Sequence, residues 1–226
     1  MPTPSHAIAA AAAAAAAVTA QERLLHSVEL MRPEQVQEAS LLPGWSRGHV
    51  LTHIARNADA LGNLVRGART GQSIPMYPSP EARDRDIEDG AGRDVAEQFT
   101  DLRDADLRLH AEFAAMPDEA WSVVVPHRLG PFPAEGIPAK RLKEIEYHHV
   151  DLGLDFRPEH WSAGFVESEL PHLTAVHTAS GLLTPELLKQ LADAPGYARV
   201  AWMSGRSDGS DLGVPVADLP VVPPLG

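Results

Sequence analysis

The sequence Gly-Trp-Ser-Arg-Gly-His-Val-Leu-Thr-His occupies residues 44–53 and joins a loop to the start of a helix. Ser46 is a favourable N-cap residue, and apolar side chains follow it at helical spacing. The pattern predicts a helix over residues 47–69. His53 lies at the flank of the apolar stripe, so its imidazole can point into a bundle core or a cavity.

A second segment, Arg-Leu-Lys-Glu-Ile-Glu-Tyr-His-His-Val-Asp-Leu at residues 141–152, carries further side chains able to bind a metal. It belongs to a predicted helix over residues 138–152, in which residues four apart share a face. Glu144 and His148 therefore lie on one face. Together with His53 they offer two imidazoles and a carboxylate, a set that can hold a zinc-like ion and leave one coordination position open.

Spacing by itself does not single out these ligands. His49 and His53 also lie four residues apart, so they form a competing ligand pair. A histidine beside an apolar stripe is usually packed or hydrogen-bonded, and Glu144 with His148 has the spacing of an ordinary surface pair. The combination favours a metal, because bundles commonly build metal sites from side chains on different helices.

Apolar periodicity also predicts helices over residues 5–31, with Ser5 as N-cap, and over residues 93–115. Four helices with one apolar face each form a bundle. We therefore expect a mainly α chain, with the bundle in residues 1–160 and a small α/β segment or cap in residues 161–226.

The segments outside the four helices have their own signals. These predict a helical turn at 33–38, a loop at 71–80, an extended piece at 122–126, helices at 167–182 and 185–192, a strand at 199–203, and an extended tail at 213–226. The C-terminal strand is the basis for expecting α/β structure there.

Composition excludes several functions. The net charge of −12 disfavours a nucleic-acid partner. The chain contains no cysteine, so any thiol chemistry must use a thiol from outside. The longest apolar run, residues 7–18, is almost all alanine; it is too short to span a membrane and lacks the basic residues of a signal peptide. We expect a cytoplasmic protein without a membrane partner.

Several segments resemble the mycothiol-dependent maleylpyruvate isomerase family. They are residues 40–49 with His53, residues 75–77 and 79–83, residues 141–152, and residues 204–209. The resemblance implies a DinB-like four-helix bundle followed by a small C-terminal α/β domain. It also implies mycothiol as cofactor and a divalent metal, usually zinc, held by His53, Glu144 and His148, with Arg206 as the catalytic arginine.

The hypothesis is a cis–trans isomerase that converts maleylpyruvate, or a similar cis-unsaturated keto acid, to the trans isomer. A metal-activated thiol adds to the double bond, the new single bond rotates, and elimination returns the thiol. Arg206 would hold a substrate carboxylate, Asp151 would orient His148, Arg83 would bind the acidic cofactor or substrate, and Trp45 would wall the cavity.

Each of these residues can equally serve an ordinary structural purpose. Arg206 and Arg83 can be solvated loop charges, Trp45 can anchor a loop, and Asp151 can be a carboxylate near a helix end. Two further functions fit the same residues: a mycothiol S-transferase acting on electrophiles, and a non-catalytic metal-binding bundle. The first takes the same thiol with a different acceptor, and the second needs no substrate.

Overall fold

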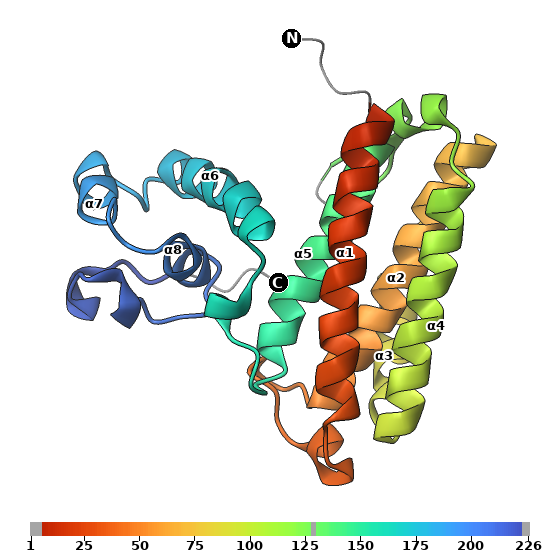
Figure 1. Cartoon of the computed structure of the whole chain (residues 1–226), viewed down its shortest axis with the longest axis horizontal. Coiled ribbons are helices and arrows are strands. Elements are labelled where there is room, and N and C mark those ends of the chain that lie inside the picture. The colour runs from red at the N-terminus through yellow and green to blue at the C-terminus, as the bar shows by residue number, and fades with distance from the viewer. Residues whose placement is uncertain (1–5, 128–129, 223–226) are drawn as a thin grey trace. The chain divides into compact units, whose positions relative to one another are not determined.

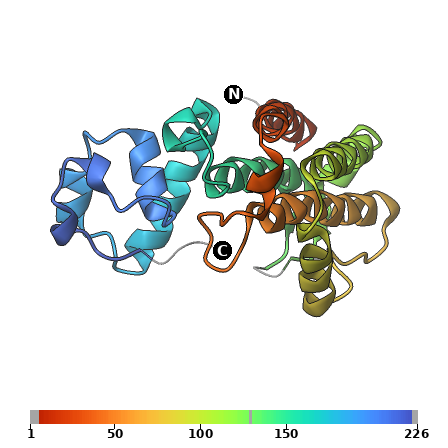
Figure 2. The same ribbon diagram turned by 90° about the horizontal axis from the view of Figure 1, so that it is seen from below.

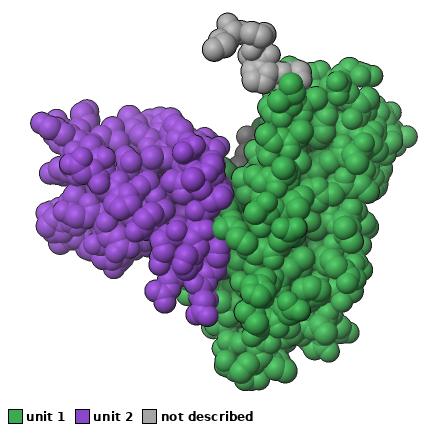
Figure 3. Space-filling model, in the orientation of Figure 1, with its two compact units in different colours: residues 1–154 green, residues 155–226 purple. Residues whose placement is uncertain are grey.

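The computed structural model describes residues 6–127 and 130–222, and the chain divides into two compact units, Met1–Leu154 and Asp155–Gly226 (Figure 3). The helices of the first unit are α1 (His6–Glu29), α2 (Arg47–Thr70), α3 (Pro80–Ala91), α4 (Val95–Ala114) and α5 (Ile137–Asp151) (Figure 1). The predicted N-cap Ser5 lies outside the described residues.

Four of these helices form the expected bundle. α1 packs against α4 and α5, and α2 packs against the same two helices, so the four close into a ring. The core side chains include Leu24, Ile54, Leu61, Leu102, Leu109 and Ile145, all fully or almost fully buried. Burial of these apolar side chains along one stripe per helix is the main force that holds the bundle together. The mainly α bundle predicted from periodicity is confirmed.

The connections within this unit agree with the local sequence. A 3-10 helix at Pro33–Gln37 occupies the predicted helical turn. Asp94 caps α4 by accepting the Glu97 N–H at 2.9 Å. The predicted extended piece contains β1 (Val124–Val125), which pairs antiparallel with β2 (Phe132–Pro133).

Helix α3 is absent from the sequence-based prediction, although its start has a clear signal. Ser79 caps it by accepting the Ala82 N–H at 3.1 Å, and Pro80 is its first residue, where a missing N–H costs nothing. The helix lies against α2, outside the four-helix ring (Figure 2). Gly48 permits the approach, since a Cβ there would lie 2.1 Å from the Ala91 carbonyl oxygen.

The regular elements described in the second unit are all helices, and the predicted strand at residues 199–203 is wrong. Its elements are 3-10 helices at Pro158–His160, Ser210–Leu212 and Val216–Asp218, and α6 (Ala163–Ala179), α7 (Pro185–Gln190) and α8 (Gly196–Met203). In α8 the buried residues Ala198, Ala201 and Trp202 follow helical spacing. A short apolar run does not distinguish a strand from a buried helix, so the expected α/β character has no strand to support it among these residues.

The tail also differs from the extended strap that was expected. Residues 216–218 form a 3-10 helix, and residues 223–226 lie outside the described part of the chain. Among the described helices, α1 alone has the length and mean hydropathy, 1.2 over its most apolar window, that crossing a membrane requires. Bundle helices can meet the same criterion, and α1 packs in the bundle. Cytoplasmic localisation stays a prediction.

Candidate metal centre

The loop before α2 determines where that helix begins. The Trp45 N–H donates to the Leu42 carbonyl oxygen at 3.1 Å, and Gly44, at φ +80°, occupies the third position of this turn after Pro43. Pro followed by Gly at these positions is the signature of a type II turn. The Ser40 hydroxyl donates to the Trp45 carbonyl oxygen at 2.8 Å and closes the loop. Ser46 then starts α2, and His53 follows in its second turn.

His49 is engaged in the local structure of the helix start. Its Nδ1 accepts the Ser46 N–H at 3.2 Å, while the Ser46 hydroxyl accepts the His49 N–H at 3.4 Å. The other ring nitrogen, Nε2, lies 3.1 Å from a carboxylate oxygen of Glu88 on α3. Among the described residues, the ligand atoms that gather around His53 are those of Glu144 and His148 and not those of His49, so the competing His49–His53 pair is not formed.

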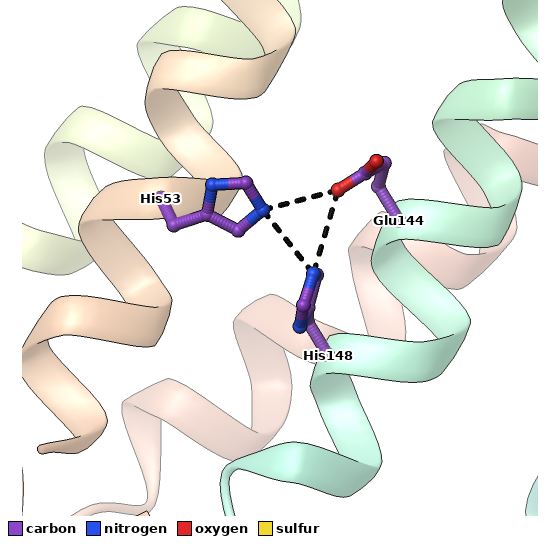
Figure 4. Close-up of side chains that lie close together, drawn as sticks. All are labelled: His53, Glu144 and His148. Carbon is purple, nitrogen blue, oxygen red and sulfur yellow. Dashed lines mark hydrogen bonds and ion pairs between the residues drawn. The ribbon is translucent and has the colours of Figure 1, made fainter. Parts of the chain in front are cut away.

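His53, Glu144 and His148 meet between α2 and α5 (Figure 4). The His53 Nε2 lies 3.1 Å from Glu144 Oε2 and 3.2 Å from His148 Nε2. The distance from His148 Nε2 to Glu144 Oε2 is 3.4 Å. Three potential ligand atoms from two facing helices therefore converge on one point.

The spacing of the three atoms fits a zinc-sized ion. Nitrogen and oxygen ligands about 2.0–2.1 Å from zinc at tetrahedral angles lie about 3.3 Å from one another. The separations in the structure are 3.1, 3.2 and 3.4 Å. The Glu144 side chain is 32% exposed, compared with 8% for His53, so the cluster can be reached from outside the bundle. Three protein ligands and an approach for a fourth are the arrangement of a catalytic metal site.

Asp151 contacts one of the candidate ligands. Its Oδ2 lies 2.8 Å from Nδ1 of His148, one helical turn earlier on α5, and its side chain is almost fully buried. A carboxylate acceptor at Nδ1 holds the proton on that nitrogen and leaves the lone pair of Nε2 directed at the cluster. The position near the negative end of α5, unfavourable for a carboxylate alone, is thus offset by this specific partner.

The electrostatics of the three ligands differ. Burial lowers the pKa of His53, more than its contact with Glu144 raises it. Burial also opposes charge on Glu144, but hydrogen bonds from His148 and His53 hold the pKa of this carboxyl well below its usual value. For His148 burial is likewise outweighed, because Asp151 and Glu144 raise its pKa. The cluster thus pairs an ionised carboxylate with a readily protonated His148.

Trp45 and Arg83, both predicted from the sequence, lie beside His53, and Tyr77, which was missed, lies beside Arg83. The Trp45 ring lies 5.6 Å from the His53 ring, centroid to centroid. Arg83, from α3, places Nη2 at 3.4 Å from His53 Nδ1 and its guanidinium 6.0 Å from the centre of the Tyr77 ring. Burial and the nearby Glu144 raise the pKa of Tyr77 to about 12, so its hydroxyl stays protonated. Tyr77 belongs to the segment 75–77, and the resemblance of this segment to the isomerase family was the sequence signal that could have revealed it.

Arg206 belongs to the second unit. It follows α8, and its backbone N–H donates to the Ala201 carbonyl oxygen at 2.8 Å, which closes the last turn of that helix. The Nη1 of its half-buried side chain donates to the Ser204 carbonyl oxygen at 3.3 Å. These contacts hold its backbone in a defined turn within the C-terminal unit.

The fold and the cluster define a four-helix-bundle protein whose facing helices direct two histidines and a glutamate toward one point. The sequence profile of the mycothiol maleylpyruvate isomerase N-terminal domain family matches residues 17–153. The chain belongs to this family. The match covers most of the first unit, including every residue of the cluster.

Solved structures extend the similarity of the fold to the second unit. The crystal structure of the mycothiol-dependent maleylpyruvate isomerase matches with a TM-score of 0.84 and 24% identity, over 96% of this chain and 97% of that chain. A histidine-to-alanine mutant of that enzyme gives the same values. The match therefore includes the second unit of this chain as well as the first. No protein of curated function matches the chain.

Proposed function

We propose that this chain is a mycothiol-dependent cis–trans isomerase that acts on maleylpyruvate or a similar cis-unsaturated keto acid. Membership of the family supports the class of reaction. The observation that carries the proposal is the convergence of His53, Glu144 and His148 at separations suited to a divalent metal, for which zinc is our first candidate.

A metal at this position would favour the thiolate form of a coordinated thiol and polarise a keto-acid oxygen. Mycothiol would supply the nucleophile, which adds to the double bond and leaves after rotation about the resulting single bond. The chain contains no cysteine, so the nucleophilic sulfur must come from such a small-molecule thiol. Asp151 would keep His148 in the tautomer that offers Nε2.

Arg83 is a candidate for binding an anionic group. In the structure, Arg83 Nη2 lies 3.4 Å from His53 Nδ1. If His53 bound a metal through Nε2, its Nδ1 would carry the proton and would no longer accept a hydrogen bond from Arg83. Arg83 Nη1 would still pair with Asp84 at 2.8 Å, while the Nη2 donors would become available for a carboxylate of the substrate or of the thiol cofactor. Trp45 would form an apolar wall beside His53.

Arg206 is our candidate for the catalytic arginine. Its planar guanidinium can bind a carboxylate through two parallel hydrogen bonds, which a lysine ammonium does not reproduce. The resemblance of residues 204–209 to the arginine-containing segment of the family supports this assignment.

The decisive experiment measures the zinc content of the purified chain together with its turnover of maleylpyruvate, followed by absorbance. Turnover that requires both mycothiol and metal would establish the proposal. Bound metal without turnover, but with conjugate formation from a panel of chloro- and epoxide electrophiles, would replace it by the S-transferase. Absence of both metal and turnover would leave a non-catalytic bundle.

A further inference from the structure

Arg141 is a fully buried cation in the centre of the bundle. Its side chain is 0% exposed, although it belongs to α5 one turn before Glu144. Its Nη2 lies 3.1 Å from Gln21 Oε1 on α1 and 3.5 Å from Asp106 Oδ1 on α4. Its Nη1 donates to the Ile54 carbonyl oxygen on α2 at 2.8 Å. One guanidinium therefore contacts the other three helices of the ring.

The contact with α2 falls directly beside the cluster. Ile54, whose carbonyl oxygen accepts from Arg141, is the residue that follows His53. Arg141 Nη1 also lies 3.4 Å from Asn57 Oδ1, one turn further along α2. The hydrogen bond from Arg141 to Ile54 therefore connects two places. One is the backbone of α2 next to His53, and the other is the turn of α5 that precedes Glu144.

A second arginine makes the reciprocal connection on the other side of the cluster. Arg47, the first residue of α2, donates through Nε to the Leu152 carbonyl oxygen at 2.7 Å, just after the end of α5. Its Nη2 lies 3.3 Å from the Gly153 carbonyl oxygen. The antiparallel helices α2 and α5 are therefore connected by an arginine on each side of the cluster, Arg47 on one side and Arg141 on the other.

Stability alone does not call for a charge at position 141. Burial of a guanidinium is expensive, and apolar side chains of similar volume often serve a core equally well or better. The acceptors around Arg141 come from three helices, and each contact requires a specific distance between helices. A planar fork with fixed donors is suited to defining such distances, whereas apolar packing tolerates small shifts.

We infer that Arg141 is a positioning residue for the metal cluster: through Ile54 it sets the separation of α2 and α5 at the level of His53 and Glu144. The inference rests on the proposed function, because it assumes that the cluster binds a metal. Ligands must be held to within about 0.5 Å for a metal to receive its preferred geometry, so a small change in helix separation would weaken binding.

The test compares Arg141→Met with Arg56→Met in the full chain. Arg56 lies on α2, the helix that carries His53. Its ion pair with Asp101, at 2.5 Å, connects α2 to α4 and not to α5. Zinc affinity is measured by competition with a chromophoric chelator, and site geometry by the visible absorption of the cobalt-substituted protein. Both variants are also melted without metal, so that loss of stability is recorded separately.

We expect Arg141→Met to lose about tenfold or more in zinc affinity and to change the cobalt spectrum, as mutations in the shell around metal ligands do. Arg56→Met should melt earlier but keep the parental affinity and spectrum. An Arg141→Met variant that folds and retains both would overturn the inference. A parent chain that binds no metal would instead overturn the proposed function, and this inference with it.

If Arg141→Met does not fold, the double variant with Asp106→Asn removes the buried charge pair while an amide remains beside His110. Removing both charges is far less destabilising than leaving one buried and unpaired. Reduced zinc affinity and an altered cobalt spectrum in this folded variant would support the role of Arg141. Parental values would exclude it.

Discussion

Asp151 and His148 form a carboxylate–histidine pair on a single turn of α5, with Oδ2 and Nδ1 2.8 Å apart. The pair explains why an almost fully buried carboxylate is tolerated near the negative end of a helix. It also fixes which imidazole nitrogen faces His53 and Glu144. We therefore expect metal binding by the cluster to depend on Asp151, which is not itself a candidate ligand.

Replacement of Asp151 tests this dependence. We expect Asp151→Ala to weaken zinc binding by about 10–100-fold, because His148 loses the partner that selects its tautomer and raises its basicity. Asp151→Asn should lose less, since an amide oxygen can still accept from Nδ1. A chelator competition titration gives the affinities. Parental affinity in Asp151→Ala would show that His148 needs no such partner.

Paired substitutions at His53 and His49 test the composition of the ligand set. His53→Ala should lose bound metal and thiol-dependent turnover together. His49→Ala should keep the metal, because this imidazole contacts Ser46 and Glu88 and lies outside the cluster. Metal content of the purified variants distinguishes the two. Full metal occupancy in His53→Ala would remove His53 from the ligand set.

Zinc affinity should depend on pH through His148. Its pKa lies above the ordinary 6.5, so the metal must displace a proton from it when the pH is below that raised value. Apparent affinity should then fall by about tenfold for each unit of decreasing pH, and level off at higher pH. Because the pKa of His53 is lowered, protons compete with the metal for this imidazole only at more acidic pH. Affinities that stay constant between about pH 6 and about pH 8 would contradict this assignment.

Arg206→Lys should reduce kcat/KM for the keto acid by about tenfold or more, because one ammonium replaces a bidentate guanidinium. The metal should remain bound, since the candidate ligands all belong to the first unit. Steady-state kinetics and metal content are measured on the same preparation. Parental kinetics in this variant would exclude Arg206 as the carboxylate clamp.

The contact between α2 and α3 can be tested through two glycines of one helix. Gly48→Ala would place a Cβ 2.1 Å from the Ala91 carbonyl oxygen, so we expect a loss of about 1–3 kcal/mol in the free energy of unfolding. In Gly62→Ala the nearest atom, Leu109 Cδ1, would be 3.9 Å away, and helix propensity predicts no loss or a gain of up to about 1 kcal/mol. Denaturant titration compares them. Equal stability of both variants would show that α3 moves aside easily.

Local signals predicted the elements that carry the cluster. The Ser46 cap and the apolar stripe placed α2 at Arg47–Thr70, one residue beyond the predicted 47–69. The predicted helix 138–152 was shifted by one residue at each end from α5, Ile137–Asp151. Spacing four apart placed Glu144 and His148 on one face, and the place of His53 at the flank of the apolar stripe of α2 made it a third candidate. These features depend on neighbouring residues in the chain, which is why the sequence reveals them.

Other features could not be predicted from neighbours along the chain. The choice between His49 and His53 depends on Glu88, a residue of a helix that was not expected from the sequence. The strand expected at residues 199–203 became α8, because packing of Ala198, Ala201 and Trp202 decides between two conformations open to a short apolar run.

By itself the sequence determined the four amphipathic helices, the need for an external thiol and the residue types able to bind a metal. Only the tertiary structure decided which of those residues converge, and that the fully buried Arg141 joins α5 to the other helices of the bundle. The physical reason is the range of the interactions. Caps and helical periodicity act over a few residues, whereas His53 and His148 meet across 95 positions of the chain through the packing of α2 against α5.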